Sequence, residues 1–499
     1  MAPRIQTPGL STFPGHLSIT SAPTPLPGWS RGRSTLSDTV RTDAPGRRPP
    51  VRRGRRTPAG PFPFPRFPRR AFLGGALAAA STPLLAACGS TGAVPPGKRE
   101  VTVWGGFEST NAELVAHFND THRDIHITWV NNGWGAGEFY PKLQTTLHAE
   151  AGPPDVFLID RTLIPNLVVR GYLLDLGPYG AAGDAAHYAE PAWERCGAGE
   201  EIYGIPVDSG PLALFHREDL FAGHGIEVPA TWDDYAAAAE RVKAADRSAF
   251  IGTLGPSELL TALVSQAGGR FFRYDMSDPT RLGLSFDTPE ARRVIDFWGG
   301  LVRAGLVDTT PYFSTEMDVN LGRGVYWTCL APSWYSWQIE SKLVDQAGRW
   351  RVRGAPQWDP GRPASGNWGG SAYVATRFAQ DPEAAAVVCR EIFGADQTAW
   401  DMALWTARLF PDRLEQARSD AFAGRPADFF GGQRVNEVYI ESSEQVLASD
   451  HSPFERFVTD TFDVALHDAV AGRVPWPDLL AVVEERVADY AREQAFDVH

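Results

Sequence analysis

Two spacings in the sequence match catalytic or nucleotide-binding motifs, and neither has the context that its chemistry needs. Gly28-Trp-Ser30-Arg-Gly32 matches the G-x-S-x-G pattern of a serine nucleophile, but that device requires a strand before the serine and a helix after it. The surrounding residues are rich in proline instead. Gly92 to Lys98 matches G-x-x-x-x-G-K, yet Pro95 and Pro96 lack the N–H groups of a phosphate loop, and Arg99 replaces the Ser or Thr. The sequence therefore predicts neither a serine hydrolase nor an ATP site.

Histidines and carboxylates form no recognisable metal or catalytic set. His122 and His126 are four residues apart, but the second begins a predicted strand, so the two side chains do not share a helix face. Glu484 and Glu485 lie on the solvated face of a predicted helix, and no other carboxylate pair is typical of a glycosidase. A pair contributed by two lobes stays open. We expect no enzyme activity, no catalytic residue, no metal and no cofactor.

Tryptophan is the residue type whose placement predicts a ligand. Five of the 16 Trp lie at a strand end or close to Gly, Pro or Asn in predicted loops: Trp104, Trp134, Trp334, Trp337 and Trp368. An indole on a loop can meet a ligand, and a pyranose ring offers an apolar C–H face to stack on it. Asp160 and Asp208 end predicted strands and can pair with sugar hydroxyls. Packing explains each Trp alone equally well, but the set favours a sugar-like ligand.

The elements that must position these residues alternate between strand and helix. Strands are predicted at 101–104, 125–130 and 156–159, with helices at 111–119 and 139–151 between them. Helix starts are marked by Thr231, Thr288 and Asp381, each a capping residue before Pro or an acid. An amphipathic helix at 476–495 closes the chain. This order is typical of a doubly wound α/β fold, and about 400 residues should form two lobes rather than one core.

Charge excludes two classes of partner. The chain has 499 residues with 47 Lys plus Arg and 60 Asp plus Glu. Residues 1–87 hold 13 of the basic and two of the acidic residues, which leaves 34 basic and 58 acidic residues in the rest. Because nucleic acids and anionic membrane surfaces attract Lys and Arg clusters, so acidic a body predicts neither as a partner. Neutral and cationic ligands stay open.

The first hundred residues are typical of an export signal and its flanks. Residues 1–68 contain 14 Pro and no apolar periodicity, which predicts a disordered extension. Residues 69–88 combine Arg69-Arg70-Ala-Phe-Leu with a 17-residue apolar run and Cys88, and they resemble a twin-arginine lipoprotein signal with a lipobox. Lipidation of Cys88 would place the protein on the outer face of the cytoplasmic membrane, tethered by residues 89–100. Of the remaining cysteines, Cys196, Cys329 and Cys389, an odd number cannot all pair, and small core residues are the simpler interpretation.

Several segments taken together resemble a known family. VTVWGGF, ITWV, FYPKLQTTLHAEAGPPDVFLID, IYGIPVDSGPLALFHREDLF and NWGGSAYVATRF resemble, in this order, the extracellular solute-binding proteins of bacterial ABC importers. The most similar type is the carbohydrate-binding (maltose-binding-protein-like) family, and the resemblance covers residues 100–499. It implies two α/β lobes that close on a mono- or oligosaccharide, and permease membrane subunits as partners. The protein would bind and deliver the sugar as a monomer, without covalent chemistry.

The resemblance also assigns residues and lobes. It places Asp160 and Arg161 at the cleft, Asp208 and Ser209 at the first crossover, and Asn367 and Trp368 at the return crossover. Trp334 aligns with a stacking aromatic of the second lobe, followed by Trp337, with Trp405 and Arg408 as weaker candidates. The implied first lobe comprises residues 101–210 and 355–400, and the second comprises 211–354 and 401–499. RTLIPN after LID departs from the family pattern and puts the identity of the ligand in doubt.

Other functions stay open at this stage. The same fold could bind a glycerol phosphate, a polyamine or a metal chelate; a phosphate would need Arg, Lys or helix N-termini, and a polyamine would need carboxylates with aromatics. A secreted carbohydrate-active enzyme would share the Trp-lined cleft but would also need an acid and base pair. A surface adhesion or signalling module without a transporter would have the same sequence features.

Overall fold

The computed structural model describes residues 94–106, 108–133, 139–406, 408–447 and 451–499. The predicted extension, the export signal, Cys88 and Trp134 lie outside the described residues. Among the described residues, no helix combines the length and apolar character needed to cross a bilayer.

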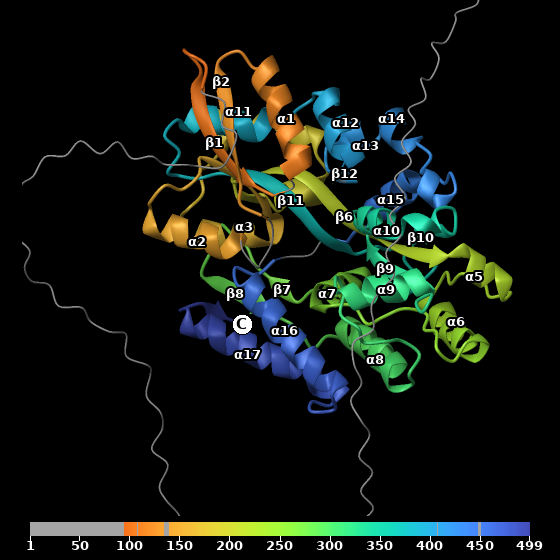
Figure 1. Cartoon of the computed structure of the whole chain (residues 1–499). Coiled ribbons are helices and arrows are strands. Elements are labelled where there is room, and N and C mark those ends of the chain that lie inside the picture. The colour runs from red at the N-terminus through yellow and green to blue at the C-terminus, as the bar shows by residue number, and fades with distance from the viewer. Residues whose placement is uncertain (1–93, 107, 134–138, 407, 448–450) are drawn as a thin grey trace, which may run out of the picture. The chain divides into compact units, whose positions relative to one another are not determined.

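Parallel strands form where the sequence alternates between strand and helix. β1 (Arg99–Gly105) lies between β2 (Ile125–Asn131) and β3 (Val156–Asp160), and pairs with both in parallel. α1 (Glu108–Thr121) connects β1 to β2, and α2 (Phe139–Ala149) precedes β3. α12 (Gln397–Thr406) packs on α1, and α11 (Pro382–Glu391) packs on β11 and β1 (Figure 1). We call these elements the first lobe.

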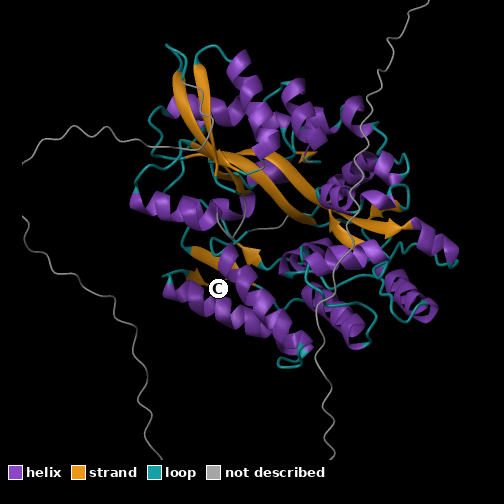
Figure 2. Cartoon of the chain, viewed as in Figure 1, coloured by secondary structure: helices purple, strands orange, loops and turns teal. Residues whose placement is uncertain are grey.

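Two long strands carry the sheet out of the first lobe. β6 (Ile205–Arg217) pairs through its first half with β11 (Asn367–Ala375), and through its second half with β9 (Thr328–Pro332) and β10 (Trp350–Gly354). β11 also pairs with β3. All of these pairings are antiparallel, and they give one mixed sheet in the order β10-β6-β11-β3-β1-β2, with helices on both sides of the strands (Figure 2). β6 and β11 are therefore the crossover strands.

The second lobe surrounds β9, β10 and the second half of β6. Its longer helices are α6 (Trp232–Ala245), α7 (Ser257–Gln266), α8 (Pro289–Arg303), α9 (Thr315–Arg323), α10 (Tyr335–Lys342), α15 (Val435–Glu444), α16 (Glu455–Val470) and α17 (Leu479–Glu493). Trp232 packs its ring at 5.1–5.9 Å from those of Tyr235, Phe297, Trp298 and Trp358. This aromatic cluster joins α6 to α8 and fixes the core of the second lobe.

Shorter elements complete the described chain. A small sheet has the order β13 (Asp497–Val498), β8 (Arg281–Leu284) and β7 (Phe272–Arg273), and a hairpin joins β4 (Gly197–Ala198) to β5 (Glu201–Ile202). β12 (Phe410–Pro411) pairs with β6. The short helices are α3 (Ile164–Val169), α4 (Glu190–Glu194), α5 (Glu218–Gly223), α13 (Leu414–Ala417) and α14 (Asp420–Ala423).

The predicted helix starts are confirmed by their caps. Thr231 and Asp234 form a reciprocal capping box at α6. The Thr288 hydroxyl accepts a hydrogen bond from the N–H of Ala291, and an Asp381 carboxylate oxygen accepts one from Ala384. The closing helix predicted at 476–495 is also confirmed: a short turn at Trp476–Asp478 leads into α17 (Leu479–Glu493). Cys196, Cys329 and Cys389 are free and buried, as small core residues.

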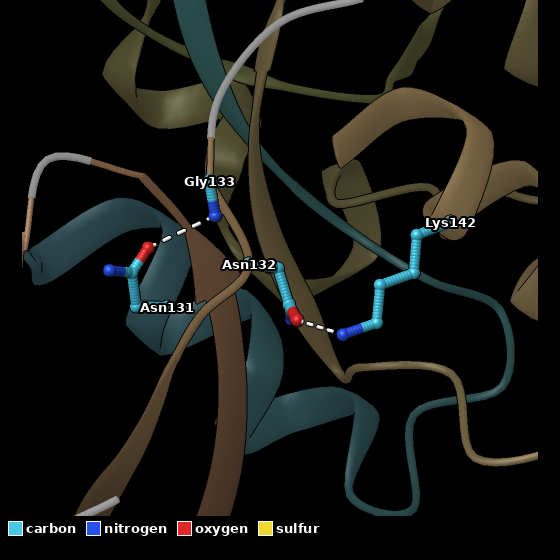
Figure 3. A pocket seen from close by; sticks show the side chains of 4 residues that line it. All are labelled: Asn131, Asn132, Gly133 and Lys142. Atoms are coloured by element: carbon cyan, nitrogen blue, oxygen red, sulfur yellow. Dashed lines mark hydrogen bonds between the residues drawn. The ribbon is translucent and has the colours of Figure 1, made fainter. Parts of the chain in front are cut away.

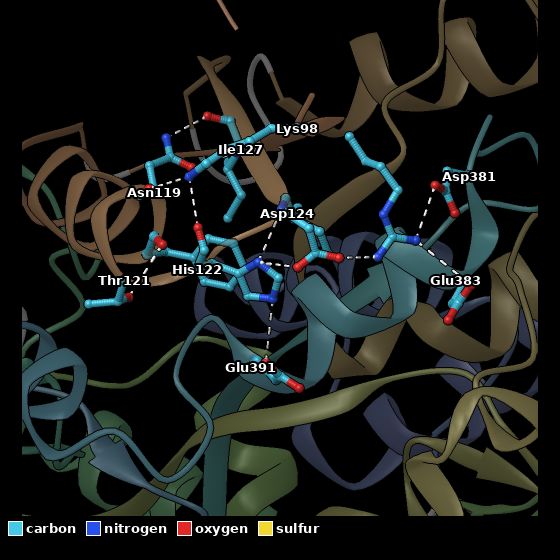
Figure 4. A network of polar contacts seen from close by, with 12 residues as sticks. Lys98, Asn119, Thr121, His122, Asp124, Ile127, Asp381, Glu383 and Glu391 are labelled. Atoms are coloured by element: carbon cyan, nitrogen blue, oxygen red, sulfur yellow. Dashed lines mark hydrogen bonds and ion pairs between the residues drawn. The ribbon is translucent and has the colours of Figure 1, made fainter. Parts of the chain in front are cut away.

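A polar network fixes the start of β1, at the opposite end of the sheet from the carboxyl ends of the parallel strands (Figure 4). The Lys98 ammonium donates to the carbonyl oxygens of Asn119 and His122, both at 2.7 Å, and so caps the end of α1. The Arg99 guanidinium lies 2.9 Å from Asp124 and 3.4 Å from Asp381. Lys98 and Arg99 thus join the first described strand to α1, to the turn before β2, and to the start of α11.

Candidate functional site

Most of the predicted site residues lie where the parallel strands end. β1, β2 and β3 end at Gly105, Asn131 and Asp160, on the same edge of the sheet. β11 runs antiparallel to β3 with Ser371 opposite Asp160, so that the residues before Ser371 extend beyond this edge. In open α/β sheets, ligands bind outside the carboxyl ends of the strands.

Buried charges join the crossover strands to the end of β3. Arg161 is 2% exposed, and its guanidinium lies 2.6 Å from the Asp412 carboxylate. The same guanidinium donates to the carbonyl oxygen of Asp208 at 2.9 Å and to the hydroxyl of Ser209 at 2.8 Å. An Asp208 carboxylate oxygen accepts hydrogen bonds from the N–H and the hydroxyl of Ser371 on β11. We call Arg161, Asp208, Ser209, Ser371 and Asp412 the crossover network.

The crossover network holds two carboxylates against one guanidinium. Burial raises the pKa of Asp208 to about 6; the Ser371 hydrogen bonds oppose this rise, and the charge of Asp412 adds to it. Gly370, at φ +118°, lets β11 approach the Arg161 side chain, because a Cβ at this position would lie 2.1 Å from a guanidinium nitrogen of Arg161. The network thus fixes the strands that connect the lobes. The predicted contacts of Arg161, Asp208 and Ser209 with a ligand stay predictions.

An aromatic platform lies beside the crossover strands in the second lobe. It comprises Tyr312, Phe313, Trp334, Tyr335 and Trp368, whose rings pack at centroid distances of 5.8–6.2 Å. The Trp334 indole N–H donates to the carbonyl oxygen of Trp368 at 3.0 Å. Gly210 makes room for this contact, because a Cβ there would lie 2.0 Å from that carbonyl oxygen and 2.8 Å from the indole nitrogen. Trp334 and Trp368 are therefore brought together.

Phe313 gives the aromatic platform an exposed face. Its ring is parallel to that of Trp334 within 13°, at 6.2 Å, and its side chain is 48% exposed. The backbone at Phe313 has φ +63°, a left-handed conformation that a bulky residue rarely adopts. Backbone strain of this kind concentrates at functional sites. Trp337, in the first turn of α10, is 44% exposed.

A pocket of about 430 Å³ opens at the end of β2 (Figure 3). It is lined by Asn131, Asn132, Gly133 and Lys142. The Lys142 ammonium donates to the amide oxygen of Asn132 and lies 5.2 Å from the ring centre of Trp104. We call it the first-lobe pocket; its lysine lies beside the predicted residue Trp104.

Three carboxylates from both lobes with raised pKa values lie near the end of β3. The pKa values of Asp160, of Glu258 on α7 and of Glu455 on α16 are all raised, mainly by burial. The charges of Asp160 and Glu258 raise the pKa of Glu455 further, to about 8, while Arg195 opposes the rise. Arg195 and His451 line a cavity of about 390 Å³ that also includes Tyr274.

The remaining predicted residues have structural roles or lie outside the description. The Asn367 amide accepts from the N–H of Gly210 at 2.9 Å and donates to the carbonyl oxygen of Gly369 at 2.7 Å, so it shapes the crossover. Arg408 pairs with Glu340 at 2.8 Å. Trp405 lies in α12, but its side chain is outside the described residues. No group of three or more metal-ligating side chains occurs within the described ranges.

Sequence reasoning missed Phe313, Lys142 and Glu455. Phe313 had a local signal, since it directly precedes the capping Ser314 of α9 and so lies on a loop. Lys142 is one of only four lysines in the chain, and it lies in the first turn of α2. Glu455 had no local signal, because 295 positions separate it from Asp160.

These observations define the class of protein. Two α/β lobes are joined by a continuous mixed sheet, and the strand ends, the aromatic platform and the carboxylates lie at the junction. This is the arrangement of a two-lobed periplasmic-type binding protein, as predicted.

Comparisons with known proteins identify the family. Residues 105–388 match the family model described as bacterial extracellular solute-binding protein, and the chain belongs to this family. It is 24% identical over 407 residues to a lactose-binding protein of Rhizobium radiobacter, covering 78% of this chain and 92% of that protein. It is 23% identical over 387 residues to an arabinooligosaccharide-binding protein of Halalkalibacterium halodurans, covering 72% of this chain and 81% of that protein.

A solved structure shows the same fold. The ABC transporter associated binding protein from B. animalis subsp. lactis, in complex with β-1,6-galactobiose, superposes with a TM-score of 0.70. The identity is 23%, over 80% of this chain and 99% of that one. The two-lobed fold is therefore confirmed, and the relatives named above are binding proteins.

Proposed function

We propose that this protein is a carbohydrate receptor of an ABC importer, which binds a mono- or oligosaccharide between its lobes and delivers it to permease subunits. The observation that carries this proposal is the aromatic platform, in which Phe313 and Trp334 stack in parallel and Phe313 is 48% exposed. An exposed, pre-ordered aromatic face suits the C–H face of a pyranose ring. The sugar ligands of the relatives support the same class of ligand.

The position of the aromatic platform suits a receptor that closes on its ligand. Trp334 and Trp368 contact the crossover strands directly, while the first-lobe pocket lies at the ends of β1 and β2. A ligand that touches both lobes stabilises the state in which both contacts form, and this differential affinity drives closure. Closure in turn excludes water from a polar ligand. Asp160 and Asp208 are the carboxylates that we expect nearest to the hydroxyl groups.

Export and lipid anchoring are part of the proposal. The support is the order of Arg69-Arg70, the apolar run and Cys88 in the sequence. A lipid on Cys88 would hold the receptor on the outer face of the cytoplasmic membrane, near its permease. Mass spectrometry of the mature protein tests this step: the expected N-terminal residue is an acylated Cys88, and an unmodified residue 88 inside a longer chain would contradict it.

Ligand binding is tested by a thermal-shift screen of the purified protein against mono- and oligosaccharides. A sugar at 100 times its Kd stabilises the folded state by about 2.7 kcal/mol, which raises the Tm of a folded unit of about 400 residues by about 3 °C. Trp334→Ala should lower the affinity at least tenfold, as truncation of a central aromatic anchor does. Val319→Ala, which removes an exposed apolar side chain from α9, is the control. Consumption of the sugar during the assay would favour an enzyme instead.

A second candidate is a ligand with an amino group, such as an amino sugar or a polyamine. The observation in its favour is that the charge of Asp160 raises the pKa values of Glu258 and Glu455, and that the charge of Glu258 raises the pKa of Glu455 as well. A cation bound among them would relieve this repulsion. In the same screen, putrescine and spermidine test this candidate: a Tm shift with these amines and none with sugars would replace the carbohydrate assignment.

A further inference from the structure

We propose that the first-lobe pocket (Asn131, Asn132, Gly133 and Lys142) binds an anionic group of the ligand, so that the preferred carbohydrate carries a carboxylate or a phosphate ester. The inference rests on the proposed function, because it concerns one end of the sugar site. It names a substrate class, acidic sugars, within that function.

The first step is the orientation of the Asn132 amide. Lys142 carries only N–H donors, so the Asn132 atom that it contacts is the amide oxygen. The other end of the amide, the Asn132 NH₂ group, is thereby fixed as a donor. This NH₂ has no hydrogen-bond partner within the described residues, although Asn132 is only 9% exposed. A buried donor without an acceptor destabilises the folded protein, because it loses its hydrogen bonds to water and gains none in return. The first-lobe pocket therefore requires an acceptor.

The second step is the charge of Lys142. Within the described residues its contacts are the Asn132 oxygen and the face of Trp104, and it forms no ion pair there. Lys342, by contrast, lies 2.9 Å from the Asp318 carboxylate. The contact with Trp104 orients the ammonium without neutralising its charge. Two of its three N–H groups are left for a ligand.

The third step is the match between these donors and a ligand group. The Asn132 NH₂ and the Lys142 ammonium converge on one cavity of about 430 Å³. Figure 3 shows the two side chains end to end, from the loop after β2 and from α2. A hydroxyl offers one oxygen to this pair, whereas a carboxylate or phosphate offers two or more and carries the opposite charge. Hydrogen bonds between charged partners are about twice as strong as neutral ones. An anionic group thus satisfies both donors at once.

The test compares sugars that differ only at C6. Glucose, glucuronate and glucose 6-phosphate form one set, and galactose, galacturonate and galactose 6-phosphate form another; digalacturonate and galactobiose extend the comparison to disaccharides. Titration calorimetry on the intact protein measures each Kd at two salt concentrations. We expect the anionic member of at least one set to bind at least tenfold more tightly than the neutral one, with a preference that shrinks at high salt. If the uronate gains more affinity over the neutral sugar than the sugar phosphate does, the group bound in the pocket is a carboxylate. If the sugar phosphate gains more, the group is a phosphate.

Two variants of the first-lobe pocket and one control separate the causes. Lys142→Met keeps the stem over Trp104 but removes the charge, and should reduce the preference for the anion at least tenfold. Asn132→Asp keeps an acceptor for Lys142 but replaces the donor by an anion, and should reverse the preference. Lys342→Met removes one positive charge far from the pocket and should leave the preference unchanged. Circular dichroism establishes that each variant is folded.

The outcomes distinguish this inference from the proposed function. If neutral sugars bind as well as the anionic ones, or if both pocket variants keep the preference, the anionic subsite is wrong and the carbohydrate receptor stands. If no sugar of any kind binds, the proposed function fails and the inference fails with it.

Discussion

The variant Phe313→Gly should be more stable than Phe313→Ala, although alanine is the more stabilising of the two residues at most positions. Phe313 has φ +63°, and an L-residue in the left-handed region costs about 1–2 kcal/mol relative to glycine. Glycine loses about 0.5–1 kcal/mol to the greater freedom of its unfolded chain. The balance favours Phe313→Gly over Phe313→Ala by about 0.5–1 kcal/mol.

Both variants should be less stable than the parent protein. A phenylalanine buries about 200 Å² when fully covered, and Phe313 is 48% exposed. Its removal therefore exposes or vacates about 100 Å², which at about 25 cal/mol per Å² is a loss of about 2.5 kcal/mol. Phe313→Ala should lose nearly all of this amount, and Phe313→Gly about 2 kcal/mol or less. Both variants should also bind the ligand more weakly, because the platform loses its exposed ring.

Urea denaturation followed by tryptophan fluorescence measures the difference. With a slope of about 3 kcal/mol per M for a protein of this size, the midpoint of Phe313→Gly should lie about 0.2–0.3 M above that of Phe313→Ala. Val319 on α9 is the matched control, because it is 41% exposed and lies in regular helix. There alanine should be the more stable variant. An alanine midpoint equal to or above the glycine midpoint at position 313 would refute the argument from backbone strain.

Two further predictions concern buried charges. Arg161→Met leaves the Asp412 carboxylate without its ion-pair partner in a site where both side chains are 2% exposed. The free energy of unfolding, measured by urea denaturation, should therefore fall by about 3–5 kcal/mol, and the double variant Arg161→Met, Asp412→Leu should recover much of the loss. A double variant as unstable as Arg161→Met alone would count against the pairing. Glu455 has a pKa raised to about 8, so the folded state holds its proton more tightly than the unfolded chain, and stability should fall as the pH rises from about 4 to 8. Glu455→Gln should stabilise the protein at pH 8 and have little effect at pH 4.5; equal effects of the substitution on Tm at both pH values would contradict the raised pKa.

The fold was predictable where its signals are local. Thr231, Thr288 and Asp381 cap helices through bonds to residues three positions later, so short sequence windows contain the whole interaction. The continuous sheet was less accessible, because β6 changes partners midway: its first half pairs with β11 and its second half with β9 and β10. A run of buried apolar residues predicts a strand but does not indicate which strands pair with it.

The candidate site shows the same division. Trp334 and Trp368 were predicted as ligand-facing residues on loops. Trp334 does lie just before α10, but Trp368 lies within strand β11, so its predicted loop setting was wrong; a hydrogen bond joins the two residues. Phe313 was missed because exposure and a positive φ are properties of the folded backbone. Arg161 was predicted to face the ligand, yet the structure pairs it with Asp412, 251 positions away. Partners this distant in sequence meet only through the completed sheet.

The network around Lys98 and Arg99 has a mechanical consequence. If the chain is anchored through Cys88, any pull on the receptor enters at the start of β1, where Lys98 and Arg99 tie it to the end of α1, to Asp124 and to Asp381. β1 lies between two parallel neighbours, β2 and β3. A force along β1 therefore loads many hydrogen bonds together in shear instead of opening them one at a time. With such an anchor, the strand that first receives the pull would also be the one that resists it best.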